Sequence, residues 1–380
     1  MRIADLRAVP ISFPVPADQS VRLGIGRSVK RDAVLVRVET DQGHVGWGEA
    51  HHGRCPGAIA KLVDTTLREL VLGFDAHDVA GVWARVYKMQ LASHGMGAAA
   101  ALALSGLDMA LWDLRCQAAG MPLYRLLGGS AKPVKAYAGG IALGWQEPAL
   151  LAEEALRHIA SGYRALKLRV GDTAVRDIAR VRAVRKAVGD EIDILVDANT
   201  NYTLDDVRKV MPAFEEAAVG WLEEPFPPQD RRAYAAAALL GRVPLAAGEN
   251  HHTRYEFATL LEDGDVLFVQ PDLSKTGGVT EAMRIAAMAS AQKLTVNPHT
   301  SATAINMATT IHFLCAIDNP GYFEGDVTSL NPFRDRLADH APYALDDQGC
   351  VRPREGMGIG LTIDLNFIAE HPLIEGPCYV

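Results

Sequence analysis

The sequence predicts an α/β protein, a β/α barrel with an additional α+β domain. In the second half of the chain, residues of acid, base or metal-ligand type recur at intervals of 28, 26, 26, 23, 27 and 25 residues, counted from Arg169. They are Asp197, Glu223, Glu249, Asp272, His299 and Glu324. One strand, one helix and their loops take about 25 to 30 residues. The chain therefore returns to one level of the structure once per unit, which is typical of the C-terminal strand ends of a barrel.

A short apolar segment precedes or contains each of these positions. The segments span residues 134–140, 165–170, 193–199, 220–225, 244–250, 265–272, 293–299 and 321–326. They lack clean alternation of polar and apolar residues, as expected for parallel strands covered on both faces. Between them, stretches such as 174–188 and 278–292 repeat apolar residues at intervals of three and four, which predicts helices. Strands that alternate with helices predict a parallel sheet.

The rest of the chain does not follow this period. Residues 1–60 have the pattern of β-strands, and residues 56–128 form Ala- and Leu-rich helical stretches. We therefore expect an N-terminal α+β domain over residues 1–130, completed by residues 329–380, and a barrel over residues 131–328. A chain of 380 residues exceeds what one hydrophobic core usually supports, so two domains are expected on length alone.

Composition indicates an ordinary enzyme of the cytoplasm. The net charge is −8 and the basic residues are scattered, so no nucleic-acid partner is expected. No apolar run approaches the roughly 18 residues that span a membrane, and the first residues lack the apolar core of a signal peptide. The five cysteines are odd in number and far apart, which favours a reducing compartment.

Three acids at consecutive strand ends predict a metal site. Asp197, Glu223 and Glu249 each follow an apolar segment, and in a barrel they converge on one point. Without a cation they repel one another, and one is driven to take up a proton. All-oxygen ligation suits Mg²⁺ or Mn²⁺. Glu224 is the alternative to Glu223; we prefer Glu223 because its neighbour precedes Pro225 and starts the loop.

The next strand ends carry a candidate base. A carboxylate that accepts a hydrogen bond from one imidazole nitrogen fixes the tautomer and raises the basicity of the other. Asp272 and His299 end neighbouring segments and suit such a pair, whereas a lone histidine is more often a core residue. Lys167 and Arg169 lie two apart in one strand, so both point into the barrel. Buried cations require an anion between them, either a substrate carboxylate or the acidic cluster.

Several motifs together resemble the enolase superfamily, in its mandelate racemase subgroup. The resemblance covers nearly the whole chain. The motifs are Lys167-Leu168-Arg169, Asp197-Ala198-Asn199, "WLEEP" at 221–225, "GEN" at 248–250, "PDLSKTGGVTE" at 271–281, "NPHTSA" at 297–302, Glu324, "GLDMALWDL" at 106–114 and "PLYRLLGG" at 122–129.

The resemblance implies a modified TIM barrel, (β/α)7β, with an α+β capping domain. It also implies one Mg²⁺ per subunit, abstraction of the proton α to a carboxylate of a small-molecule substrate, and a homo-oligomer. The metal ligands would be Asp197, Glu223 and Glu249, and Asn199 would bind substrate. The base would be the Asp272–His299 dyad, with Lys167 and Arg169 on the opposite face of the substrate. Glu324 would be a protonated acid that donates to a substrate carboxylate oxygen.

The chain departs from the racemase pattern at Arg169, where the family's racemases have lysine. A guanidinium stays protonated and makes a poor base, but it anchors carboxylates and hydroxyls well. We therefore expect one-base chemistry by His299, most simply dehydration of an acid sugar to a 2-keto-3-deoxy acid. The alternatives are a racemase, epimerase or acid-lactone cycloisomerase on the same scaffold, with Lys167 as a second base, or a binding protein without catalysis.

Two N-terminal loops indicate a polar substrate. Segments 21–31 and 49–57 would cover the barrel mouth by analogy with the family. They supply basic and imidazole side chains and few aromatic ones; these are Arg22, Arg27, His51, His52 and Arg54. An apolar ring would need a hydrophobic lid, so this set favours a sugar diacid or acid lactone. We expect Arg22, His51, His52 and Arg54 to bind substrate.

Overall fold

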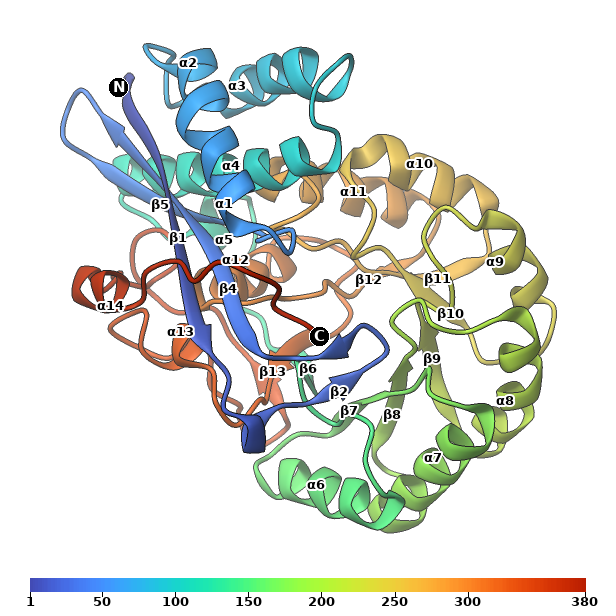
Figure 1. The fold of residues 1–380 in the computed structure, drawn as a ribbon. Helices are drawn as coiled ribbons and strands as arrows, with labels where there is room; N and C mark the ends of the chain where they lie inside the picture. The colour runs from blue at the N-terminus through green and yellow to red at the C-terminus, as the bar shows by residue number, and fades with distance from the viewer.

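The computed structural model describes residues 1–380. The N-terminal part is built on an antiparallel sheet in the order β1–β4–β5, formed by β1 (Ile3–Pro14), β4 (Lys30–Thr40) and β5 (Val45–Ala50). A short hairpin of β2 (Arg22–Leu23) and β3 (Gly26–Arg27) connects β1 to β4. This hairpin projects from the sheet toward the barrel (Figure 1).

Helices cover one face of this sheet. They are α1 (Pro56–Lys61), α2 (Arg68–Val71), α3 (Val79–Val86), α4 (Ala98–Ala119) and α5 (Leu123–Leu126), with π-helical turns at Leu62–Leu67 and Tyr87–Leu91. The long helix α4 lies directly on β5. A Cβ atom on Gly48 would stand 2.1 Å from the carbonyl oxygen of Gly106, and one on Gly46 would stand 2.2 Å from that of Ala110. Glycine is required at these two positions because helix and strand backbones touch.

The second part is the predicted barrel. Its strands are β6 (Val134–Gly139), β7 (Ala165–Arg169), β8 (Asp193–Asp197), β9 (Val219–Glu223), β10 (Leu245–Ala247), β11 (Val266–Val269), β12 (Thr295–Val296) and β13 (Phe323–Asp326). The hydrogen-bonded order runs from β12 back to β6 and then to β13, and all these pairs are parallel. Backbone hydrogen bonds from Val296 to Asn319 and from Gly321 to Val296 complete the ring.

Each of the first seven strands is followed by a helix on the outside (Figure 1). The helices are α6 (Pro148–Ala160), α7 (Ala174–Val188), α8 (Leu204–Glu216), α9 (Arg231–Ala238), α10 (Thr253–Asp263), α11 (Gly278–Ala291) and α12 (Ala304–Leu314). The eighth strand has no such helix, so the (β/α)7β barrel with an α+β capping domain is confirmed. Most strands are shorter than their apolar segments because the last residues of the segment leave the ladder as loops; β13 instead starts two residues late and ends with its segment at Asp326.

The final segment contacts both parts. β14 (Cys350–Val351) pairs antiparallel with β6 of the barrel, and short helices α13 (Pro332–Asp335) and α14 (Leu365–Glu370) flank it. Further along, the backbone N–H of Ser12 in β1 donates to the carbonyl oxygen of His371. The domain limits at residues 130 and 328 stay a prediction.

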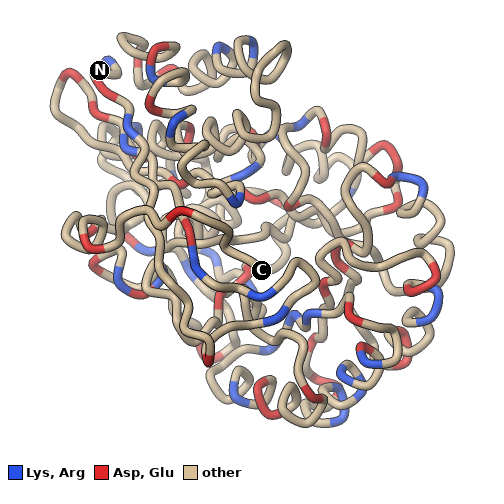
Figure 2. Tube along the Cα trace, in the orientation of Figure 1, with Lys and Arg blue, Asp and Glu red and all other residues tan.

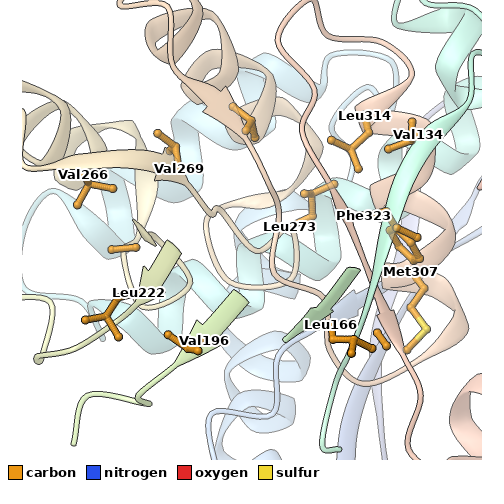
Figure 3. Packing of buried hydrophobic residues seen from close by; sticks show 14 of the residues in the cluster. Val134, Leu166, Val196, Leu222, Val266, Val269, Leu273, Met307, Leu314 and Phe323 are labelled. Atoms are coloured by element: carbon orange, nitrogen blue, oxygen red, sulfur yellow. The ribbon is translucent and has the colours of Figure 1, made fainter. Parts of the chain in front are cut away.

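A hydrophobic core of 64 buried residues lies mainly between the barrel strands and their helices. Val196, Leu222, Val269 and Phe323 from four strands belong to it (Figure 3). Inside the barrel is a separate cluster of Tyr137, Ala165, Leu195, Trp221 and Ala246. Leu195 and Trp221 each precede a strand-end acid by two residues, so they share its face. The cluster is therefore an apolar floor beneath the acids.

Both acidic and basic residues are scattered over the outside of the barrel (Figure 2). None of the helices combines the length and apolarity that crossing a membrane requires.

Candidate active site

The sequence spacing has a direct structural cause. In the barrel sheet Arg169 pairs with Asp197, and Asp197 pairs with Glu223. These three residues end β7, β8 and β9 at one level. One circuit through a helix returns the chain to the neighbouring strand at the same height, so residues about 26 positions apart become direct neighbours.

Lys167 is the centre of the acidic cluster. Its Nζ atom lies 2.8 Å from Glu223 Oε1, 3.0 Å from Glu324 Oε1 and 3.7 Å from Asp197 Oδ2. The side chain is fully buried and lies over the Tyr137 ring. Burial opposes the charged form of Lys167, but the carboxylates of Glu223 and Glu324 outweigh it and hold its pKa well above the ordinary value. In the structure this ammonium neutralises the carboxylates around it, and a role of Lys167 as a second base stays a prediction.

Arg169 lies on the open side of the same strand end and lines the pocket. One guanidinium nitrogen contacts Asp197 Oδ2, and another donates to the carbonyl oxygen of Gly140. Asp197 in turn accepts hydrogen bonds from the backbone and side chain of Asn199. Asn199 also lines the pocket, and its Oδ1 atom has no hydrogen-bond partner.

The two neighbouring glutamates differ in their surroundings. Glu223 accepts hydrogen bonds from Lys167, from Trp221 Nε1 at 3.1 Å and from Gln270 Nε2 at 2.7 Å. Glu224 lines the pocket and accepts a single hydrogen bond from Asn250, which leaves its buried Oε1 atom without a partner. Burial first, and then the charges of Glu249 and Asp197, raise the pKa of Glu224 well above its ordinary value.

His299 lies between two carboxylates at the pocket wall. Its Nδ1 atom is 2.7 Å from Asp272 Oδ2, and its Nε2 atom is 3.0 Å from Glu249 Oε2. The predicted dyad is therefore present. Burial favours the neutral ring, but the charge of Glu249, with a smaller contribution from Asp272, raises the pKa of His299 to about 10.

Asp272 is rigidly held beneath the histidine. It accepts hydrogen bonds from the backbone N–H and the hydroxyl of Ser274, both at 2.7 Å, and from Asn306 Nδ2 at 3.1 Å. Ser301 donates to the oxygen that contacts His299. Glu49 of β5 accepts from the backbone N–H of Asn306, so the capping domain supports the dyad through one intermediate residue.

Glu324 is a hydrogen-bond acceptor in β13 of the structure. The resemblance implies a neutral acid that donates a hydrogen bond. In the structure its Oε1 atom accepts from Lys167 and from the Gly140 N–H, and its Oε2 atom accepts from the Thr300 N–H. Burial favours the neutral form, but Lys167, His299 and Arg169 outweigh it and lower the pKa of Glu324 to about 2. The protonated state that the resemblance implies for Glu324 stays a prediction.

A pocket of about 420 Å³ opens above this cluster between the barrel and the capping domain. It brings together several predicted residues, namely Arg169, Asn199, Glu249, His299, His51, His52 and Arg54. The two lid histidines stack on each other with ring centroids 4.2 Å apart. Burial holds the pKa of His52 down at about 3, so this ring is neutral at working pH. The cavity suits a small polar molecule.

The prediction that Arg22 binds substrate in the active-site pocket is not supported by its position. Its side chain is exposed and lines a separate surface recess with Arg27 and Trp145, away from the active-site pocket. Arg22 and Leu23 are successive residues of a strand, and successive side chains point to opposite sides. Leu23 therefore faces the pocket instead, together with Ile25.

Other residues line the pocket that were not predicted from the sequence. Lys275 lies 3.4 Å from Glu249 Oε1 and is buried; it belongs to the "PDLSKTGGVTE" motif, which could have signalled it. Lys30, Asp32 and Tyr379 also line the pocket, and no motif or spacing signals them.

The donor set fits a divalent cation. Three buried acids, Asp197, Glu223 and Glu224, lie together with the partly exposed Glu249, and the structure holds two unpartnered oxygens at the same pocket, Glu224 Oε1 and Asn199 Oδ1. Buried oxygens without partners are costly. Carboxylate and amide oxygens are the ligands that Mg²⁺ accepts.

Comparisons with known protein families agree with this architecture. Residues 150–367 match the model described as "Enolase C-terminal domain-like", and residues 8–128 match "Mandelate racemase / muconate lactonizing enzyme, N-terminal domain". The chain belongs to the enolase superfamily, in its mandelate racemase and muconate lactonizing enzyme group. The expected family membership is thereby confirmed, as is the expectation of an enzyme on this scaffold.

Curated relatives carry two kinds of activity in their names. The chain is 33% identical to the 3,6-anhydro-alpha-L-galactonate cycloisomerase of Streptomyces coelicolor, over 89% of this chain and 91% of the relative. It is 30% identical to the arabinonate dehydratase of Saccharolobus solfataricus, over 95% and 96% of the two chains.

Solved structures agree closely in fold. A member of the enolase superfamily from Polaromonas sp. JS666 matches with a TM-score of 0.98 and 53% identity over the whole of both chains. A racemase from Streptomyces coelicolor A3(2) with bound magnesium matches with a TM-score of 0.88 and 31% identity, over 98% of this chain and all of the other.

Proposed function

We propose that this protein is a Mg²⁺-dependent acid-sugar dehydratase. The observation that carries the proposal is the dyad: His299 lines the pocket, is held by Asp272 on one ring nitrogen, and turns the other toward the acidic cluster. A positioned imidazole of this kind is the group that abstracts a proton α to a carboxylate. The polar lining of the pocket supports a polyhydroxy substrate.

Asp197, Glu223 and Glu249 would hold one Mg²⁺, with Glu224 as the adjacent acid. When bound, the cation supplies positive charge that stabilises the enolate as it develops from the substrate carboxylate. It would also offset the burial of the acids, because their mutual repulsion is strongest without it.

The protein groups would then divide the work. His299, neutral once Mg²⁺ offsets the charge of Glu249, would remove the proton from C2, and the electrons of that C–H bond form an enolate on the substrate carboxylate. Arg169 anchors a carboxylate or hydroxyl oxygen of the substrate. The C3 hydroxyl takes a proton from the imidazolium or from another acid and leaves as water, while the enolate electrons form the C2–C3 double bond. The resulting enol loses its hydroxyl proton, gains a proton at C3 and becomes a 2-keto-3-deoxy acid.

Cycloisomerisation of an acid lactone is the second candidate. The named activity of the Streptomyces coelicolor relative favours it, and so do the lid side chains His51, His52 and Arg54, which suit a compact oxygen-rich ring. Both reactions begin with the same proton abstraction. A homo-oligomeric state stays part of the proposal.

Incubation of the protein and Mg²⁺ with a panel of sugar acids and acid lactones in deuterated water, followed by NMR, tests the proposal. Dehydration gives a 2-keto-3-deoxy product. An isomerase gives exchange or rearrangement without loss of water. No change with any compound would contradict both activities and favour a binding protein.

A further inference from the structure

The last three residues of the sequence form part of the lid. Cys378–Val380 runs antiparallel to residues 27–29. The N–H of Val29 donates to the carbonyl oxygen of Cys378 at 2.9 Å, and Arg27 and Val380 exchange backbone hydrogen bonds at 2.7 and 3.0 Å. In Figure 1 this red segment ends beside the dark-blue β2–β3 hairpin. These hydrogen bonds hold the segment against the hairpin, whose residues Leu23 and Ile25 line the pocket.

Two residues of this segment, Cys378–Val380, which we call the strap, line the active-site pocket: Cys378 and Tyr379. The Arg54 guanidinium lies 5.7 Å from the centroid of the Tyr379 ring. Burial raises the pKa of the Tyr379 phenol above its ordinary value, and the positive charges of Arg31, Arg169 and Arg54 offset this only in part. The phenol is therefore neutral and can donate a hydrogen bond to a ligand.

Tyr379 also differs from most of the enclosed tyrosines. Six of them bind their hydroxyl groups to protein partners, namely Tyr124, Tyr163, Tyr202, Tyr234, Tyr322 and Tyr343. The hydroxyl of Tyr137 has no partner, but it is buried in the barrel interior. Tyr379 lines the cavity, and its hydroxyl has no protein partner. A phenol placed against a wet pocket without a partner is available to a ligand.

The cations around Tyr379 are not equivalent. Lys30 is neutralised by Asp32 at 2.9 Å, and Arg31 lies 3.8 Å from Asp326. Arg54 has no carboxylate partner, and its backbone adopts a left-handed φ of 59°, which costs on the order of 1–3 kcal/mol for a non-glycine residue. Strain of this kind concentrates at ligand-binding positions. Arg54 and Tyr379 thus form an unneutralised polar pair.

We propose that Tyr379 is a specificity-determining residue, and that its hydroxyl and the Arg54 guanidinium together bind a hydroxyl or anionic group at the substrate end remote from the reacting carbon. The chemical class of the ligand rests on the proposed function. The strap rests on backbone pairing alone.

The hydroxyl is tested by Tyr379→Phe and Tyr379→Ala in assays with the best-accepted sugar acid. A lost neutral hydrogen bond corresponds to a change of about two- to tenfold in binding, so Tyr379→Phe should raise KM by that factor and leave kcat nearly unchanged. Tyr379→Ala should raise KM further. Tyr255→Phe, a surface tyrosine outside the pocket, is the matched control and should behave like wild type.

The strap is tested without reference to activity. A variant that ends at Pro377 removes the acceptors of the Arg27 and Val29 amides, so hydrogen exchange of residues 22–29 should become faster. Tyr379→Ala keeps the backbone pairing and should leave this exchange unchanged. Unchanged hydrogen exchange in the shortened variant would show that the hairpin is stable without the strap, and would contradict this part of the proposal.

Binding of sugar acids to a variant without the base separates the proposed role of Tyr379 from the proposed function of the protein. We would titrate His299→Asn and His299→Asn/Tyr379→Phe, both with Mg²⁺, with galactarate and gluconate by calorimetry. Weaker binding in the double variant supports the subsite. If the wild type is active and both Tyr379 variants have the wild-type KM, the role of Tyr379 is contradicted, and the proposed function is not. A wild type that neither binds nor turns over any acid contradicts the proposed function and removes the ligand assigned to Tyr379.

Discussion

Lys167 Nζ lies 3.0 Å from Glu324 Oε1 inside the closed barrel, so one ammonium joins β7 to the last strand and, through Glu223, to β9. Breaking a buried ion pair on one side leaves an uncompensated charge and typically costs about 3–5 kcal/mol. We therefore expect Lys167→Met to lower the free energy of unfolding by that order. Lys135→Met, at an exposed position in β6, is the control. Denaturant unfolding measures both, and equal stability of the two variants would contradict the counter-ion role.

The proposed metal ligands predict how much each of three variants loses in Mg²⁺ affinity. Glu249→Gln and Glu223→Gln should each weaken Mg²⁺ binding by at least about tenfold and abolish turnover, because each removes a charged ligand. Glu224→Gln should weaken binding less. Calorimetric titration with Mg²⁺ gives the affinities, and thermal melts without the ion control for folding. A larger effect at Glu224 than at Glu223 would transfer the ligand role to Glu224, whose Oε1 atom is unpartnered in the structure.

The base assignment predicts different losses at the two dyad positions. His299→Asn should abolish exchange of the C2 proton and leave Mg²⁺ affinity within a few-fold of wild type. Asp272→Asn should impair exchange less completely, because the imidazole remains but its tautomer and basicity change. His340→Asn, on the exposed surface, controls for the loss of a histidine. Exchange at the wild-type rate in His299→Asn would move the base to another residue.

Because position 169 is an arginine, we expect proton exchange at C2 of the substrate to be stereoselective. A guanidinium cannot accept a proton near neutrality, and Arg169 is paired with Asp197. Deuterium should therefore enter one configuration at C2 of an accepted acid, the one that presents its hydrogen to His299. Arg169→Lys should introduce slow exchange of the other configuration. Equal incorporation into both epimers by the wild-type enzyme would favour a racemase or epimerase.

The buried His312, which lies away from the active site, should make the free energy of unfolding depend on pH in the acid range. The ring is fully buried, its Nδ1 atom accepts from the Tyr124 N–H, and burial lowers its pKa from 6.5 to about 4. The unfolded chain therefore binds more protons between these values. This contribution to stability is complete above pH 6.5, falls as the pH drops toward 4, and amounts to roughly 3 kcal/mol. His312→Asn should flatten the profile of unfolding free energy against pH, whereas His77→Asn, on the surface, should not.

The sequence was sufficient to predict the barrel and to bring the candidate reacting groups to one end of it, because both depend on a regular period. Arg169, Asp197 and Glu223 are neighbours in register, and equal spacing along the chain is the consequence of that register. The environment of each group was harder to predict. Lys167 and Arg169 share a strand face, yet one is enclosed by three carboxylates and the other reaches the pocket, which depends on side-chain packing.

The lid was the least predictable part. Arg22 and Leu23 are equally plausible pocket residues by composition, and only the hairpin register decides that Leu23 faces inward. Tyr379 reaches the pocket through backbone pairing with Ser28, a contact between segments about 350 positions apart. Pairing at such separation leaves no local pattern in a single sequence.

The closing of the barrel also sets when activity can be acquired during folding. Glu324 pairs beside Tyr137 of β6 and reaches Lys167, so the acids and their counter-ion come together only after the eighth strand has met the first. Contacts between residues so distant in sequence form slowly. In refolding, helical signal should therefore recover before the ability to bind Mg²⁺, and a chain stalled before ring closure would hold every catalytic residue and no active site.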